Sequence, residues 1–304
     1  MLDIHQLNVF LVAAETLNFT QTAQQLHMTQ PSVSQHIQGL ERHFDTQLFL
    51  RNGRNLELTD SGMVLLPLAR EAVVLSLRID ETMTSLKGDL YGHLIVGCST
   101  TPGKYILPHL LARFHNKYSQ VRITCQVSPQ LDALQSLEDG NAHFALFSLP
   151  HEGFPNIEAI SFMCDPITFI VPLNHPWAER EEIDARELLE GDLIMRETSS
   201  GTYSAVREAL AKHDISMSDL RILITLGNAE AIALAVQEGI GVGFVSKLVV
   251  DRLCHGKVAE VRVRDTEICR QIFIGRNCHR PATNAQEAFW SFLAADSGNP
   301  SEIK

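Results

Sequence analysis

Hydrophobic residues recur at helical spacing through the first forty positions of the chain. A stripe with i, i+3, i+4, i+7 spacing predicts a helix over residues 4–17, and its members are Leu7, Phe10, Leu11 and Ala14. A second, short helix is expected over residues 21–27, with Thr20 as its N-cap and the small Ala23 at a close helix crossing. A third helix is expected after a break at residues 28–29.

The third helix combines a buried face with a polar one. Thr29 is its expected N-cap, and Pro31 stands in its first turn, where a missing N–H costs no hydrogen bond. The buried positions are Val33, Ile37 and Leu40. The other face carries groups that can hydrogen-bond base edges or phosphates, and the expected DNA contacts are Thr29, Gln30, Pro31, Ser32, Ser34, Gln35 and Gln38. This arrangement is typical of a helix-turn-helix; an ordinary three-helix bundle with a solvated polar face is the alternative.

A short hairpin is expected next. Asn52-Gly53 is a strong turn signal between two short apolar runs. Beside a recognition helix such a hairpin is a wing, and we expect Arg51 and Arg54 at its tip to contact phosphates or the minor groove. The alternative is that both arginines are solvated surface residues.

An ordered set of motifs runs through these first sixty residues. It comprises Phe10…Ala14, Phe19-Thr20, Ala23-Gln24-Gln25-Leu26, Thr29-Gln30-Pro31-Ser32-Val33-Ser34, Ile37, Leu40-Glu41, Leu48-Phe49, Arg51, Leu58-Thr59 and Gly62. In this set the chain resembles the LysR-type transcriptional regulators. The family often has Arg after the second serine, where this chain has Gln35. Glutamine can bond bidentately to adenine, which is compatible with DNA binding and with a changed base preference.

A long helix is expected from Thr59 to about residue 87. Apolar residues recur at steps of three and four, close to a heptad seam. A helix of about 27 residues would be about 40 Å long, too long for one small core. We therefore expect it to pair with a second copy, through Leu65, Leu68, Leu75, Ile79 and Met83. Packing on its own domain is the alternative, and the resemblance also implies a linker helix that joins subunits.

From residue 93 the pattern changes to short apolar runs separated by helical segments, which predicts parallel α/β layers. Strands are expected at 94–98, 121–127, 143–147, 167–171, 193–195, 222–225, 242–245 and 268–274. Helices are expected at 103–117, 131–137, 185–189, 203–213, 229–237 and 284–293. The resemblance implies two lobes with an effector in the cleft between them.

The predicted fold class is therefore an N-terminal all-α winged helix-turn-helix, a long linker helix and a C-terminal α/β two-lobed, periplasmic-binding-protein-like effector domain. The predicted domains are residues 1–58 for DNA binding, 59–90 for the linker (dimerisation) helix, 91–162 with 268–295 for lobe I, 163–267 for lobe II, and 296–304 for a flexible tail.

Three segments lie between a predicted strand and a predicted helix, where backbone N–H groups and the positive helix end favour an anion. The expected effector-binding residues are Ser99, Thr100, Thr101, Arg196, Ser200, Thr202 and Asn228. The alternative is structural: these groups would only cap helices, and Arg196 would only pair with Glu197. The resemblance implies that the first two segments line the pocket and that Ser99 and Thr101 match positions where relatives bind small anions. Residues 99–108 resemble regulators of carbon-fixation operons and of sulfur assimilation.

These loops lack the residue patterns of a catalytic site. Residues 196–203 contain no Gly-x-Ser-x-Gly elbow, and Glu197 and Glu230 have no evident partner. We therefore expect a sensor with no catalytic residues. An α/β enzyme with a helical cap would need a convergent acid, base or nucleophile set, and a solute-binding transport component would need export.

The composition and charge of the chain indicate where the protein acts and which partners it binds. No apolar stretch is long enough to span a bilayer, and the first residues lack the n- and h-regions of a secretory signal, so we expect a cytoplasmic protein with no membrane contact. The net charge is −11, and residues 1–58 hold three arginines and five acidic residues. The chain therefore lacks an excess of basic residues to attract DNA phosphates. Its DNA specificity must come from individually positioned side chains and from dimerisation. The expected partners are double-stranded promoter or operator DNA, a small anionic effector and further copies in a homodimer or homotetramer, with RNA polymerase as a further candidate.

The six cysteines predict neither a metal site nor a cofactor. They contain no Cys-x-x-Cys pair and no zinc-ligand spacing, and stand at positions 98, 125, 164, 254, 269 and 278. The expectation is a set of free, mostly buried thiols, with a redox or metal role as the alternative. By the resemblance, peroxide sensing is disfavoured because no cysteine pair lies within residues 196–210.

Overall fold

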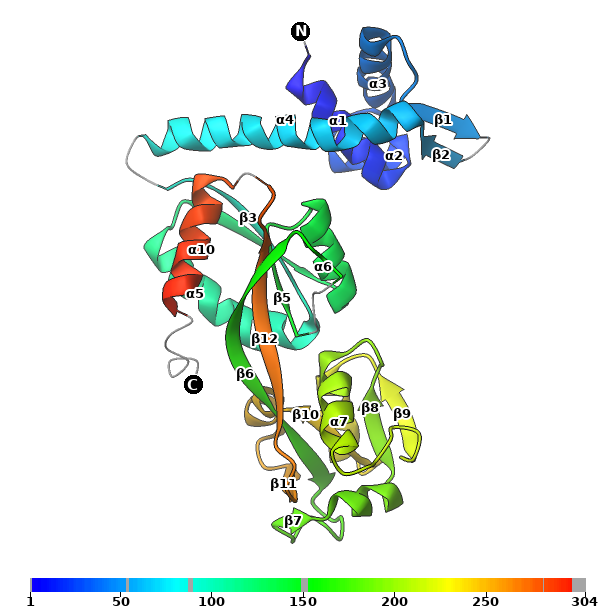
Figure 1. Ribbon diagram of the computed structural model, residues 1–304, viewed down its shortest axis with the longest axis vertical. Helices are drawn as coiled ribbons and strands as arrows, with labels where there is room; N and C mark the ends of the chain where they lie inside the picture. Colours follow the sequence, from blue (N-terminus) through cyan, green and yellow to red (C-terminus); the bar gives the residue numbers. More distant parts are fainter. Residues whose placement is uncertain (1, 53–54, 87–89, 149–152, 281, 297–304) are drawn as a thin grey trace. The chain divides into compact units, whose positions relative to one another are not determined.

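The computed structural model describes residues 2–52, 55–86, 90–148, 153–280 and 282–296 (Figure 1). It divides into two compact units. The N-terminal unit comprises residues 1–90 with 280–284, and the effector unit comprises residues 91–279 with 285–304. Two predicted features, the wing-tip residue Arg54 and the tail from residue 297 onward, lie outside the described residues.

Three helices open the N-terminal unit, as predicted: α1 (Ile4–Thr16), α2 (Phe19–Gln25) and α3 (Gln30–Phe44). The predicted N-cap of α2 was wrong. The helix begins earlier because the Oδ1 of Asn18 accepts hydrogen bonds from the backbone N–H groups of Thr20 (2.9 Å) and Gln21 (3.2 Å). An asparagine side chain satisfies two of the otherwise unpaired N–H groups at a helix start, which a threonine further on cannot do.

The start and buried face of α3 follow the prediction. The Oγ1 of Thr29 accepts from the backbone N–H of Ser32, and Pro31 lies in the first turn. Val33, Ile37 and Leu40 are buried in a core that also holds Phe10, Phe19 and Phe49. Full burial of each such apolar side chain contributes about 1.5–3 kcal/mol, so this stripe fixes which face of α3 remains outside.

The predicted hairpin consists of β1 (Phe49–Asn52) and β2 (Asn55–Leu58), paired antiparallel. It is tied to α3 by the Oε1 of Glu41, which accepts from the backbone N–H groups of Leu48 (2.9 Å) and Phe49 (3.4 Å). The hairpin is therefore held beside α3, the position expected of a wing.

The long helix α4 (Asp60–Ser85) begins at Thr59, whose Oγ1 accepts from the N–H of Gly62 at 2.9 Å. Its first half packs on its own unit: Ala69 is buried, and Leu65 contacts the core. The other residues of the predicted seam are exposed: Leu68, Leu75, Ile79 and Met83.

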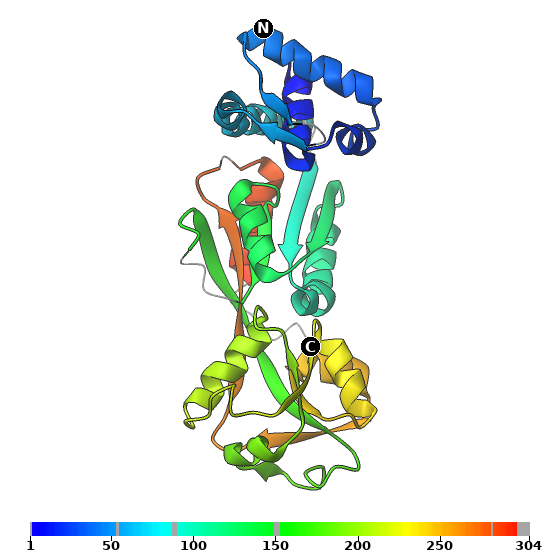
Figure 2. The ribbon, with the colours of Figure 1, turned by 90° about the vertical axis from the view of Figure 1, so that its right-hand side faces the viewer.

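The first lobe of the effector unit holds three parallel strands with helices around them (Figure 2). The strands are β3 (Gly92–Cys98), β4 (Val121–Val127) and β5 (Phe144–Phe147). The helices are the short π-helix η1 (Pro102–Ile106), α5 (Leu107–Lys117), α6 (Gln130–Asp139) and α10 (Asn284–Asp296).

The second lobe repeats this arrangement. Parallel strands β8 (Leu193–Arg196), β9 (Ile222–Leu226) and β10 (Val242–Ser246) are accompanied by α7 (Gly201–Ala211) and α8 (Ala229–Gln237). The smaller elements are β7 (Glu182–Ile183), η2 (Ala185–Glu190), α9 (Lys247–Val249), η3 (Val250–Cys254) and β11 (Val258–Val263). The prediction missed β7, α9, η3 and β11, and η2 is a 3-10 helix.

Two long antiparallel strands join the lobes: β6 (Ile157–Pro172) and β12 (Ile268–Asn277) (Figure 1). They stand in the middle of the strand order β4-β3-β5-β12-β6-β10-β8-β9. We call them the crossover strands. The pattern predicted only residues 167–171 of β6, because the first half of this strand mixes buried and exposed positions irregularly around a bulge.

A buried histidine makes the effector unit sensitive to acid. Burial, together with the neighbouring His93, lowers the pKa of His143 from its usual 6.5 to about 4. The Nδ1 of His143 accepts a hydrogen bond from the backbone N–H of Ile95 at 3.1 Å, which requires the neutral ring. Below pH 6.5 the unfolded chain therefore binds a proton that the folded chain does not, and stability falls as the pH falls toward 4.

We expect the free energy of unfolding of the effector unit to drop by about 2 kcal/mol from this histidine between pH 7.5 and pH 5. Urea unfolding followed by tryptophan fluorescence measures it, since Trp177 and Trp290 both lie in this unit. His143→Asn keeps an acceptor near the Nδ1 position but does not titrate. A parent and a variant with equal pH dependence would contradict the prediction.

Candidate effector site and DNA-binding face

A cavity of about 280 Å³ lies in the effector unit where loops from both lobes meet. It is lined by residues of all three predicted segments and of two more. The lining residues are Ser99, Thr100, Thr101, Val127, Ser128, Pro129, Gln130, Arg196, Glu197, Ser199, Ser200, Gly201, Gly227 and Arg270. Most of these residues are polar or charged.

Four helical segments start at this cavity, two from each lobe. In lobe I they are η1, preceded by Ser99–Thr101, and α6, which begins at Gln130. In lobe II they are α7, which begins at Gly201, and α8, just after Gly227. Helix N-termini present unpaired N–H groups and a partial positive charge, so their convergence favours an anion.

Arg196 supplies a cation at the cavity. Its Nε and Nη2 donate to Glu197 at 2.9 and 2.7 Å. Burial alone would raise the pKa of Glu197, but the hydrogen bonds from Arg196 and from the backbone N–H of Glu197 itself lower the pKa overall, so this carboxylate is ionised at neutral pH. Among the described residues the Nη1 of Arg196 has no hydrogen-bond partner, which leaves this donor available to a ligand.

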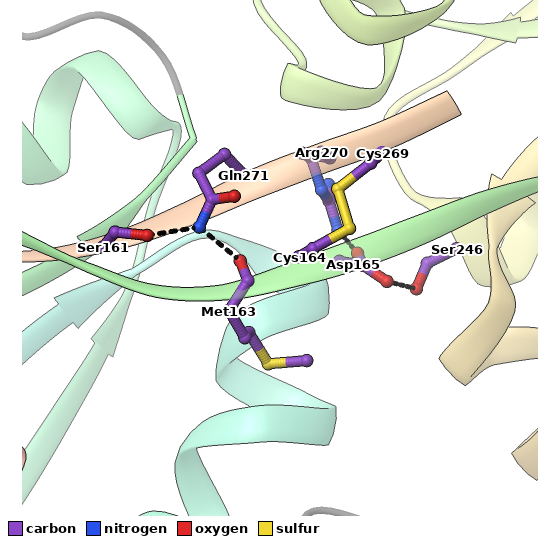
Figure 3. The surroundings of a disulfide bond; sticks show 8 residues. All are labelled: Ser161, Met163, Cys164, Asp165, Ser246, Cys269, Arg270 and Gln271. Atoms are coloured by element: carbon purple, nitrogen blue, oxygen red, sulfur yellow. Dashed lines mark hydrogen bonds and ion pairs between the residues drawn. A yellow bond between two sulfur atoms is a disulfide. The ribbon is translucent and has the colours of Figure 1, made fainter. Parts of the chain in front are cut away.

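A second cation, Arg270 on β12, was missed by the sequence analysis. Its Nη2 donates to Asp165 on β6 (Figure 3). Its Nη1 donates to the Oγ1 of Thr202 at 3.1 Å. Asp165 also accepts from the hydroxyl of Ser246 at 2.6 Å. The Nε of Arg270 is buried and has no partner in the described part of the chain. The available signal was a charged residue inside the mostly apolar run 268–274.

Five of the predicted effector residues line the cavity together: Ser99, Thr100, Thr101, Arg196 and Ser200. Within the described residues the three hydroxyls of the first segment make no hydrogen bond, and none of them caps η1. They are therefore available for a ligand rather than used by the helix.

The other two predicted residues do not line the cavity. Thr202 is buried behind it, where it accepts from Arg270. Asn228 caps α8, with its Oδ1 accepting from the N–H of Ala231 at 2.7 Å. For Asn228 the structure matches the alternative that the sequence left open, which was helix capping.

Both acids that seemed unpartnered in the sequence have partners. Glu197 pairs with Arg196, and Glu230 accepts from the Oη of Tyr105 at 2.7 Å and from the Nζ of Lys104. Because Glu230 is in lobe II and the other two are in lobe I, these contacts link the lobes beside the cavity. The carboxylates are held in ion pairs and hydrogen bonds rather than placed as a general acid and base.

Gly201 at the start of α7 lies close against side chains of lobe I. A Cβ at this position would lie 1.9 Å from the hydroxyl oxygen of Ser148 and 3.1 Å from Gln130 Nε2 and Arg270 Cδ. The Oε1 of Gln130 accepts from both the backbone N–H and the hydroxyl of Ser148, at 2.6 and 2.9 Å. A side chain at residue 201 would therefore push the lobes apart.

The polar face of α3 is open to solvent. The predicted DNA-contacting residues on it are exposed or half-buried: Thr29, Gln30, Pro31, Gln35 and Gln38 are exposed, and Ser32 and Ser34 are half-buried. The side chain of Arg51 and all of Arg54 lie outside the described part of the chain. None of the glutamines or serines packs into the core, so this face is free to meet a partner.

Metal sites and membrane-spanning helices are both absent from the described part of the chain. No group of three or more His, Cys, Asp or Glu side chains among them is arranged to hold a metal ion. None of their helices combines the length and apolar character needed to cross a membrane.

Residues 4–63 match the bacterial regulatory helix-turn-helix proteins of the lysR family, and residues 87–297 match the LysR substrate binding domain. Since the second match alone covers more than half of the chain, the protein belongs to the LysR family of transcriptional regulators.

Individual proteins agree with this assignment. The chain is 30% identical over 292 residues to a probable RuBisCO transcriptional regulator of Trichormus variabilis, covering 94% of this chain and 86% of the relative. Full-length CbnR in complex with its target DNA has the same fold (TM-score 0.65, 21% identity, 97% and 100% coverage). So does the regulatory domain of CcmR from Synechocystis in complex with 2-PG (TM-score 0.62, 24% identity, 69% and 99% coverage). The resemblance to carbon-fixation regulators is confirmed.

Proposed function

We propose that this regulator binds promoter or operator DNA through the polar face of α3, as a dimer or tetramer joined by α4, and that a small anion in the effector cavity controls this binding. The observation that carries the proposal is the cavity, where four helix N-termini meet two arginines. Each guanidinium group of the lining is paired with a carboxylate, Arg196 with Glu197 and Arg270 with Asp165, so the excess positive charge comes from the four helix N-termini. The protein would act in the cytoplasm, as a sensor and not as an enzyme.

A phosphorylated carboxylate is the ligand class that fits best. The hydroxyls of residues 99–101 and the N-termini of α6 and α7 suit a phosphate, and the Nη1 of Arg196 suits a second anionic group. CcmR, whose regulatory domain has this fold, was solved with 2-phosphoglycolate. A RuBisCO operon is correspondingly the proposed target. Mass spectrometry of small molecules retained by the native protein, followed by calorimetry with 2-phosphoglycolate, tests this ligand class.

We expect Gln35→Ala to weaken operator binding by about 1–3 kcal/mol, or roughly tenfold to a hundredfold, because one amide contact to a base edge is lost. Fluorescence anisotropy with promoter DNA measures the affinity. Gln135→Ala, the same change on the exposed side of α6, is the matched control. Equal operator affinity in both variants would remove Gln35 from the DNA contacts.

We expect Ser99→Ala to weaken 2-phosphoglycolate binding about tenfold to a hundredfold, the loss of one hydrogen bond to a charged group. Calorimetry measures the dissociation constant. Ser218→Ala, an exposed serine away from the cavity, is the control. Unchanged affinity in Ser99→Ala would place the ligand elsewhere in the cavity.

A further inference from the structure

Two cysteines, far apart in sequence, meet on the crossover strands. Cys164 on β6 and Cys269 on β12 form a disulfide, with their Cα atoms 5.8 Å apart (Figure 3). This separation lies within the range that a disulfide spans without backbone movement. The expectation of free, mostly buried thiols was wrong for this pair: the two residues are bonded, and both are exposed.

The other cysteines form no disulfide in the described part of the chain. In the described chain Cys98, Cys125, Cys254 and Cys278 are free. Partial burial raises the pKa of the thiols of Cys98, Cys125 and Cys254, which favours the protonated form at neutral pH.

The disulfide lies directly behind the effector cavity. On the crossover strands Asp165 stands opposite Arg270, and each cysteine precedes one member of that pair. Successive side chains of a strand point to opposite faces. The cysteines therefore lie on the outer face, while the ion pair is buried on the inner face, where Arg270 lines the cavity.

The disulfide also lies beside a bend. The pairing of β6 with β12 shifts register between Ile272 and Phe273, and opposite this point Phe162 is the extra residue, two positions before Cys164. A bulge bends its strand and increases the local twist. A change in the angle between the lobes requires both strands to bend and slide here, and a bond between them restricts that motion.

We propose that Cys164 and Cys269 are a redox modification site: a reversible disulfide across the crossover strands that sets the mobility of the lobes and so the affinity of the cavity. A DNA regulator works in a reducing compartment, where protein disulfides are usually transient or redox-sensing rather than structural. The part that concerns affinity rests on the proposed effector site.

The reaction is thiol–disulfide exchange with a low-molecular-weight disulfide. The thiolate of one cysteine attacks the small disulfide, which forms a mixed disulfide and releases one small thiol. The thiolate of the second cysteine then displaces the other small thiol and closes the protein disulfide. Two electrons pass to the small disulfide, and the two cysteine protons end on the released thiols. An excess of small thiol reverses both steps.

The first test needs no effector. Full-length protein is reduced, equilibrated with oxidised glutathione and alkylated with iodoacetamide before peptide mass spectrometry. We expect a linked pair of peptides containing Cys164 and Cys269, and amide hydrogen exchange in β6 and β12 slowed by about fivefold or more relative to the reduced protein. Cys125→Ser/Cys278→Ser, which removes the other exposed cysteines, should respond fully, and Cys164→Ser should not respond.

The second test uses 2-phosphoglycolate as the probe in calorimetry. We expect its dissociation constant to differ by about fivefold or more between the oxidised and reduced parent, and by less than twofold in Cys164→Ser. Alkylation of both cysteines after oxidation, or equal hydrogen exchange in both states, would overturn the redox site. Slowed exchange with equal affinities would overturn the coupling to the cavity. If the probe binds in neither state while exchange slows, the proposed ligand class has failed and the redox site stands.

Discussion

Replacing Asp165 by Asn is expected to lower the free energy of unfolding of the effector unit by about 3–5 kcal/mol. The side chains of Asp165 and Arg270 are 0% and 3% exposed. The amide keeps the shape of the carboxylate and an acceptor for Ser246, but leaves the guanidinium of Arg270 as a buried charge without its counter-ion. Most single substitutions lower the free energy of unfolding by less than this. The loss is large here because the guanidinium of Arg270 is almost fully buried, so water compensates little for the missing carboxylate.

Urea unfolding at neutral pH, followed through Trp177 and Trp290, gives this free energy for the effector unit alone. Glu208→Gln is the matched control: it makes the same chemical change in the exposed Arg207–Glu208 pair and should stay within about 0.5 kcal/mol of the parent. The combination Asp165→Leu, Thr202→Val, Ser246→Ala and Arg270→Met removes the whole polar cluster and should recover most of the loss while abolishing anion binding. A stability of Asp165→Asn equal to that of the parent would refute this account.

The elements predicted best are those whose signal is local. The stripe of α3, its cap at Thr29 and the hairpin around Asn52 all depend on residues within a few positions of one another. For the same reason the loop at residues 99–101 could be found as a ligand-binding segment, since a strand, three hydroxyls and a helix follow one another directly.

The elements missed depend on pairing across the chain. Nothing near Arg270 indicates that its counter-ion is Asp165, because the two residues meet only through the register of β6 with β12. The disulfide was missed for the same reason: a separation of 105 residues hides it from any spacing rule. The first half of β6 was missed because the bulge breaks the alternation on which a strand prediction relies.

Placing glutamates on the exposed half of α4 is expected to weaken operator binding by about 10²–10⁴-fold. In Leu75→Glu/Ile79→Glu the substituted side chains are 53% and 55% exposed in the single chain. Folding of one chain should therefore change little, as for most surface substitutions. If α4 pairs with its copy along this seam, four carboxylates would meet in an apolar interface, and the dimer would separate. The loss of affinity follows because two linked DNA-binding domains bind far more tightly than one.

Leu77→Glu separates this effect from a general cost of placing a charge on the helix. Leu77 is as exposed as Leu75, at 53%, but lies two residues along the helix and therefore on another face. Sedimentation equilibrium should find the double variant monomeric and Leu77→Glu dimeric, and anisotropy with promoter DNA should find full affinity only in the latter. A dimeric double variant that binds the operator like the parent would mean that the subunits associate elsewhere. In that case the exposed row of α4 would need a different partner to cover it.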